Sequence, residues 1–149
     1  MWNGSALAQQ AQQRYLQMQV ETASPGQLVL MLYQGCLRFI AQGRAALAAQ
    51  DFDTARVSLL KAQDIIVELA ASLDMEAGGE IAINLLRLYD YLHHRLVAAN
   101  IHRDGDAAAE VEALLRTLLP AWEEAVRQHQ ADLRAAPPHP SQLAPATPA

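Results

Sequence analysis

The chain has 149 residues, a length typical of one domain that buries its core without disulfides or metal. Apolar residues make up 52% of it and aromatic residues only 5%, a Leu- and Ala-rich composition that favours helices over sheets. A net charge of -5 argues against a nucleic-acid-binding protein, which would carry a basic patch, and the single cysteine, Cys36, excludes an internal disulfide.

The sequence shows no secretion signal, and its longest apolar run, residues 28–33, is far too short to cross a bilayer. We therefore expect a cytoplasmic protein without membrane insertion.

Residues 1–20 predict a short N-terminal helix with a thin apolar stripe among many glutamines, formed by Leu7, Ala11, Tyr15 and Met18. Such a stripe has little apolar area with which to hold the helix in place. We expect this segment to act as a displaceable lid.

A second helix begins sharply, because Ser24 can cap it, Pro25 suits its first turn and Gln27 stands in capping-box position. It is expected to run to about Gln50. Its apolar residues spread over about 200° of the circumference, whereas an ordinary surface helix needs a stripe of about 100°. They are Leu28, Val29, Leu30, Leu32, Tyr33, Cys36, Leu37, Phe39 and Ile40.

A third helix is predicted to start near residues 51–53, where aspartates favour a helix N-terminus. Its main stripe has a regular spacing and consists of Ala55, Leu59, Ala62, Ile66, Leu69 and Leu73. A second, narrower stripe holds Val57, Leu60 and Val67. Because the main stripe already supplies a core face, the second stripe is the better candidate for a binding surface.

Gly78 and Gly79 predict a break, followed by a fourth helix to about His102 that is again apolar around half its circumference. A fifth, ordinary amphipathic helix is expected over about residues 106–130. Residues 131–149 then form a Pro-rich tail that we expect to be disordered. The sequence thus predicts an all-α protein, an antiparallel four-helix bundle over residues 21–130 with an additional short N-terminal helix.

Residue patterns for catalysis or for a metal are missing: no Glu-x-x-His pair, no His-Glu-x-x-His, no CxxC and no glycine-rich phosphate loop. We therefore expect no enzymatic activity, no metal and no cofactor. Two alternatives remain open at this point. One is a signalling bundle that carries a phosphoryl group on His94, and the other is a structural module that associates with itself.

Several segments, in this order and spacing, resemble the flagellar secretion chaperone family FliS. They are Tyr15, TASP at residues 22–25, the continuation from Leu28 to Phe39, KAQDIIVEL at 61–69, Leu73-Asp74, GGEIAINLLRLYDY at 78–91 and AWEEA at 121–125. The resemblance covers about residues 15–127. It implies a helical bundle without enzymatic activity that binds the C-terminal segment of flagellin, prevents its premature polymerisation and helps to deliver it to the export apparatus. It also implies contacts with the export-gate component FlhA and the regulator FliW.

The wide apolar arcs suggest that grooves on a monomer or weak dimer accept amphipathic helices of flagellin. The candidate groove residues are Leu30, Tyr33, Leu37, Val57, Leu60, Val67, Leu86, Tyr89 and His93. Tyr15 and Leu16 are the candidates for a lid over the groove. The competing interpretation is that the second and fourth helices are simply buried on several sides.

Overall fold

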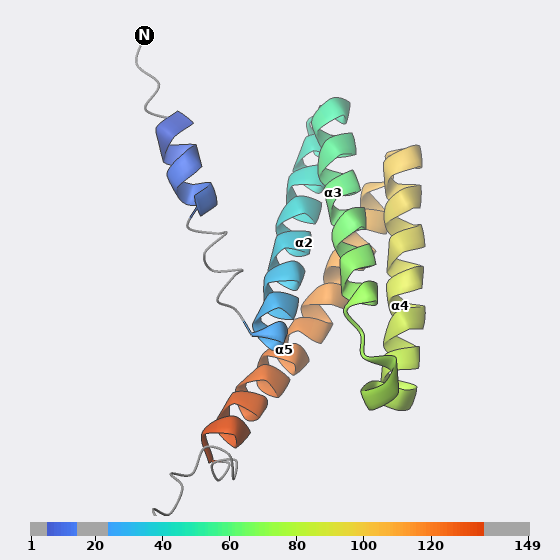
Figure 1. Ribbon diagram of the computed structural model, residues 1–149. Coiled ribbons are helices and arrows are strands. Elements are labelled where there is room, and N and C mark those ends of the chain that lie inside the picture. Colours follow the sequence, from blue (N-terminus) through green and yellow to red (C-terminus); the bar gives the residue numbers. More distant parts are fainter. Residues whose placement is uncertain (1–5, 15–23, 136–149) are drawn as a thin grey trace, which may run out of the picture.

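A computed structural model describes residues 6–14 and 24–135 of the chain. Its main body contains four long helices: α2 (Pro25–Ala48), α3 (Phe52–Ala71), α4 (Met75–His102) and α5 (Gly105–Ala135). Each packs against two neighbours, and together they close a ring in the order α2, α3, α4, α5. Successive helices run in opposite directions (Figure 1). The predicted all-α, antiparallel four-helix bundle is confirmed.

Residues 6–14 form the short N-terminal helix that the sequence predicts, and all of their side chains are exposed. Tyr15 and Leu16, the proposed lid residues, lie outside the described residues. So does the end of the chain beyond Ala135.

Each long helix starts at a polar cap. The Ser24 side chain accepts a hydrogen bond from the Gln27 backbone at 3.2 Å, and the Gln27 side chain accepts one from the Ser24 backbone at 3.1 Å. Asp51, Asp74 and Asp104 accept hydrogen bonds from the first backbone N–H groups of α3, α4 and α5. These bonds satisfy donors that have no partner inside a helix, so the starting points are fixed locally.

Two predicted boundaries need correction. A helical turn already precedes the glycine pair, because Asp74 caps α4, and the predicted break is a kink at Gly79, whose φ is 52° and ψ is -128°. At the other end, α5 continues through Pro120 to Ala135, so residues 131–135, which we expected in the tail, are helical. The lower part of α5 extends beyond the body of the bundle (Figure 1).

The core lies along the axis of the ring and combines one stripe from each helix. Its largest fully buried side chains are Tyr33, Tyr89, Ile40, Leu59, Ile66, Leu69, Leu92, Leu96, Leu115, Val111 and Cys36. Gly43 allows α2 and α3 to approach closely, since a Cβ there would lie 2.8 Å from Leu59 Cδ2. Asn100 of α4 donates hydrogen bonds to the Arg56 carbonyl and to the Gln63 side chain of α3.

Candidate functional site

An apolar groove opens at the end of the bundle where α2 and α4 begin. Its volume is about 670 Å³. The groove exists because the helices have unequal lengths. α2 has 24 residues and α3 has 20, so α2 extends about 6 Å further than its neighbour. The first turns of α2 therefore extend past the end of α3, and their apolar side chains line a hollow together with Glu68 and Ala71 from the last turn of α3.

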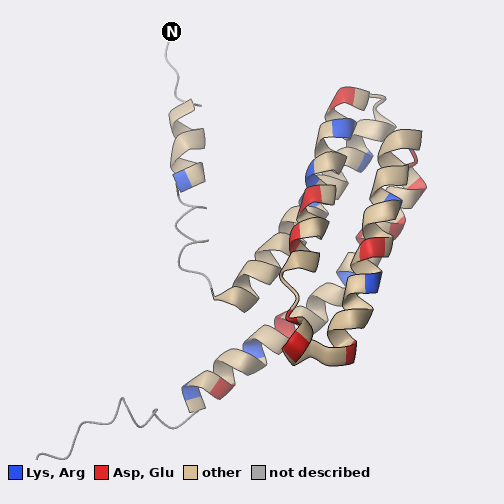
Figure 2. Cartoon of the chain, turned by 45° about the vertical axis from the view of Figure 1, so that its right-hand side comes forward, with Lys and Arg blue, Asp and Glu red and all other residues tan. Residues whose placement is uncertain are grey.

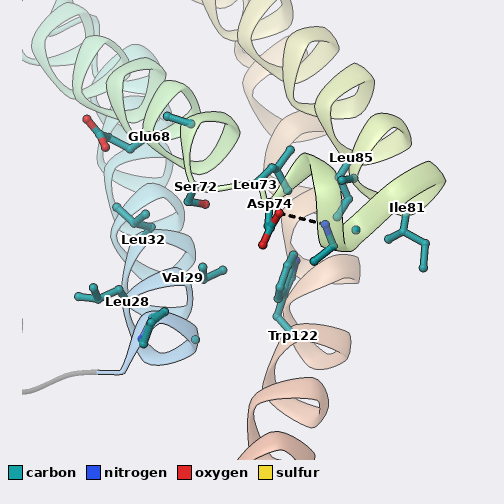
Figure 3. A pocket seen from close by; sticks show the side chains of 16 residues that line it. Leu28, Val29, Leu32, Glu68, Ser72, Leu73, Asp74, Ile81, Leu85 and Trp122 are labelled. Carbon is teal, nitrogen blue, oxygen red and sulfur yellow. Dashed lines mark hydrogen bonds between the residues drawn. The ribbon is translucent and has the colours of Figure 1, made fainter.

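The groove has two apolar walls and a floor (Figure 3). The first turns of α2 supply one wall, with Leu28, Val29 and Leu32. The α3–α4 connection and the start of α4 supply the other, with Leu73, Ile81 and Leu85. Trp122 of α5 lies between the walls and is half-buried. Such a concave, mostly apolar hollow is typical of binding sites for apolar ligands or helix faces.

Two buried tyrosines lie behind the groove and connect it to the core. The ring of Tyr33 lies 6.2 Å from that of Trp122 and 6.5 Å from that of Tyr89. The hydroxyl groups of the two tyrosines share a hydrogen bond of 2.6 Å, so neither is left without a partner. Burial raises the pKa of both tyrosines above its ordinary value, and both therefore remain neutral over the physiological range.

A second apolar surface lies on the outside of α3 and α4. It consists of Val57, Leu60 and Val67 on α3 and of Ile83 and Leu86 on α4, each between 40% and 53% exposed. Exposed apolar side chains on α3 and α4, two helices that contact each other, are candidates for a surface that binds a partner. We call this surface the outer face.

The structure divides the predicted site residues into three groups. Val57, Leu60, Val67 and Leu86 are exposed on the outer face, while His93 is half-buried. Leu30 is half-buried beside a shallow depression between α2 and α5 that also includes Pro120 and Val126. Tyr33, Leu37 and Tyr89 belong to the core, with at most 8% exposure. These three could contact a partner directly only if the bundle opened.

Sequence reasoning did not single out the residues that line the end groove. It placed Leu28, Val29 and Leu32 in the wide apolar arc of the second helix and gave Leu85 and Trp122 no separate role. Helical periodicity identifies the residues on the apolar side of a helix, but the hollow arises because neighbouring helices end at different levels. The capping residues Ser24 and Asp74, which fix two of those ends, were the available signal.

The potentially reactive side chains Cys36 and His94 form hydrogen bonds to backbone carbonyl groups. Burial raises the pKa of the Cys36 thiol to about 12, and this thiol donates to the Ala62 carbonyl. His94 is exposed, and its Nδ1 donates to the Asp90 carbonyl at 2.8 Å. Within residues 6–14 and 24–135 no group of three or more His, Cys, Asp and Glu side chains could hold a metal ion. In the same part of the chain, no helix combines the length and apolarity that a bilayer crossing requires.

Comparison with known proteins gives a consistent result. The family described as "Flagellar protein FliS" matches residues 7–129. A flagellar secretion chaperone FliS of Bacillus subtilis is 40% identical over 118 residues, which cover 79% of this chain and 87% of the relative. The corresponding protein of Salmonella typhimurium is 43% identical over 115 residues, covering 74% and 85%. That of Escherichia coli is 43% identical over 121 residues, covering 76% and 88%. This chain therefore belongs to the FliS family of flagellar secretion chaperones.

Proposed function

We propose that this protein binds the C-terminal segment of flagellin in the cytoplasm and keeps it from polymerising before export. The apolar end groove carries this proposal, because it offers an open hollow between α2 and α4 on an otherwise well-packed bundle. An amphipathic helix that inserts its apolar face there would hide that face from other flagellin copies. Membership of a family of secretion chaperones supports the choice of client.

The outer face is proposed as a second docking surface for the same client. Val57, Leu60 and Val67 lie on the side of the bundle formed by α3, whereas the end groove lies between α2 and α4. A segment that contains two short amphipathic helices could occupy both surfaces by wrapping around the bundle. Because the client orders as it binds, part of the contact energy is lost as entropy, and the complex remains reversible.

The N-terminal segment is proposed as a lid on the end groove. It leads directly into Ser24 and Pro25, and Pro25 is itself part of the α2 wall. The segment can therefore reach the groove without a long connection. Tyr15 and Leu16 would supply its apolar contacts.

The proposal of further partners is supported by the family resemblance alone. We propose that the chaperone, as a monomer or weak dimer, presents its client at the export apparatus through contacts with the export-gate component FlhA. We propose a contact with the regulator FliW for the same reason. Neither contact is needed for the client-binding role.

Calorimetric titration with flagellin from the same organism tests the client proposal. We expect saturable one-to-one binding with a negative heat-capacity change, because apolar area is buried. Flagellin truncated before its C-terminal segment should give no binding heat. Removing residues 1–18 of the chaperone should leave the bundle folded and raise its affinity for flagellin. An unchanged affinity would refute the proposal that this segment is a lid. Absence of binding to full-length flagellin, with the bundle folded, would refute the client proposal.

A further inference from the structure

Acidic residues, which we call the acidic rim, line the end groove or neighbour its lining residues in the sequence. Between Ala62 and Leu86 the sequence contains five carboxylates and no Lys or Arg: Asp64, Glu68, Asp74, Glu76 and Glu80. Glu68 and Asp74 themselves line the groove. The facing part of α2, residues 24–37, has no charged side chain at all. On α5, Glu123 and Glu124 directly follow the floor residue Trp122.

These carboxylates are mostly unpaired within the described residues. Glu124 has an ion pair with Arg127, but none is formed by Glu68, Asp74, Glu76, Glu80 or Glu123. The Asp74 carboxylate accepts hydrogen bonds from two backbone N–H groups of α4. The start of α4 shows several acidic positions and no basic one (Figure 2).

The opposite end of the bundle differs. There Arg44 and Arg116 both pair with Glu112, and Arg103 stacks over the Phe52 ring at 3.8 Å. Basic side chains thus lie among the acidic ones at that end, although Asp51, Asp53, Asp104 and Asp106 form no ion pair there with any residue that the structure describes. At the end with the apolar groove, by contrast, residues 24–37 and 62–86 contain no Lys or Arg.

We infer that the end groove selects an amphipathic helix that carries Lys or Arg beside its apolar face. This inference rests on the proposed function, in which the groove seats a client helix, and adds the sign of charge that the client needs there. An apolar face would fill the hollow while its flanking cations lie against Glu68, Glu76 and Glu80. Complementary charge of this kind speeds association and discriminates against clients of the wrong sign.

The other possible occupants fit the rim poorly. A second copy that docked through the same end would bring two identical acidic rims together, and each copy already has a net charge of -5. The side chains of residues 1–23 include one cation, Arg14, and one anion, Glu21, so this segment brings no net charge to the groove. A cationic amphipathic helix from a partner is the occupant that complements both the apolar walls and the rim.

Two synthetic 18-residue amphipathic peptides with the same Leu- and Ala-rich face test the inference, one with Lys and one with Glu on the flanks. Titrated against the full chain by calorimetry at low salt, the Lys peptide should bind at least tenfold more tightly. Raising the salt to about 0.5 M should largely remove the difference, because screening then acts within a few ångströms. In the variant Glu68→Gln, Glu76→Gln, Glu80→Gln, the preference should fall to threefold or less.

A matched control variant removes three exposed carboxylates elsewhere: Asp53→Asn, Asp90→Asn and Asp132→Asn. It changes the net charge by the same amount and should retain the tenfold preference. A preference that falls equally in both variants would reflect overall charge and overturn the inference. If the two peptides bind the natural chain with equal affinity, the inference is overturned but the client proposal is not. The same holds if equal affinity arises because the N-terminal segment fills the groove. If neither peptide binds, the groove itself fails as a client site. A doubled mass that either peptide reverses would assign the groove to a second copy.

Discussion

Tyr33 and Tyr89 connect the two helices that form the walls of the end groove. Their hydroxyl groups, both in the core, satisfy each other across 2.6 Å. A buried hydroxyl without a partner is costly, whereas removing both partners together is nearly neutral. The pair therefore acts as a unit, and its effect on stability should not be the sum of two independent residues.

The substitutions Tyr33→Phe and Tyr89→Phe test this coupling. Each alone should lower the free energy of unfolding by about 1–3 kcal/mol, since it leaves one buried hydroxyl unpaired. The double variant should lose clearly less than the sum of the two, as measured by urea denaturation. Additive losses would show that the hydrogen bond is absent in solution.

Single-residue roles were only partly predictable from the sequence. The periodicity placed Cys36 inside an apolar arc and indicated a buried thiol, which the structure confirms. It could not decide whether Tyr33, Leu37 and Tyr89 face a groove or the core, because both surfaces belong to the same half of each helix. That decision depends on how closely the four helices approach one another, which no local pattern encodes.

At the scale of the elements, the kink at the start of α4 shapes the groove. Gly79 adopts φ 52° and ψ -128°, a conformation that residues with a Cβ rarely take. The turn before it carries Ala77 and Gly78, and the turn after it carries Ile81, all of which line the groove. The kink thus orients the wall that α4 contributes.

Substitution Gly79→Ala should lower the free energy of unfolding by about 1–3 kcal/mol, because alanine is strained in this backbone conformation. It should also weaken client binding, since a straightened α4 would displace the groove wall. Gly105→Ala is the matched control, because an added Cβ there meets no atom within 4 Å. Thermal unfolding and calorimetry report the two effects. Equal stability of the two variants would contradict the role given to Gly79.

Helix starts were predictable where a cap was recognised in the sequence, because caps are local, but the start of α4 at Met75 was missed. Ser24 and Gln27 form the capping box that the sequence indicates, and Pro25 occupies the first turn. The ends were less predictable: α5 continues beyond the expected residue 130 to Ala135. Its helical pattern fades gradually there, and no residue in that region enforces a stop.

At the scale of the whole molecule, the bundle has its apolar hollow at one end, whereas the hollow of about 640 Å³ at the other end is lined by charged side chains such as Arg44, Asp106 and Glu112. The antiparallel ring follows from four long amphipathic helices joined by short connections, and this much was predictable. The outer face was also predictable, because the second stripe of α3 could not be used by the core. The end groove was not, because it depends on the difference in length between α2 and α3 and on the position of Trp122 in a third helix.

Trp122 offers the most direct test of the claim that the end groove seats flagellin. The chain has two tryptophans, so Trp2→Phe leaves Trp122 as the only fluorescent indole. Titration with a tryptophan-free C-terminal segment of flagellin should shift the Trp122 emission to shorter wavelength and saturate at one equivalent, because the half-exposed ring becomes covered. Binding seen by calorimetry without any change in this emission would show that flagellin docks elsewhere and would contradict the account.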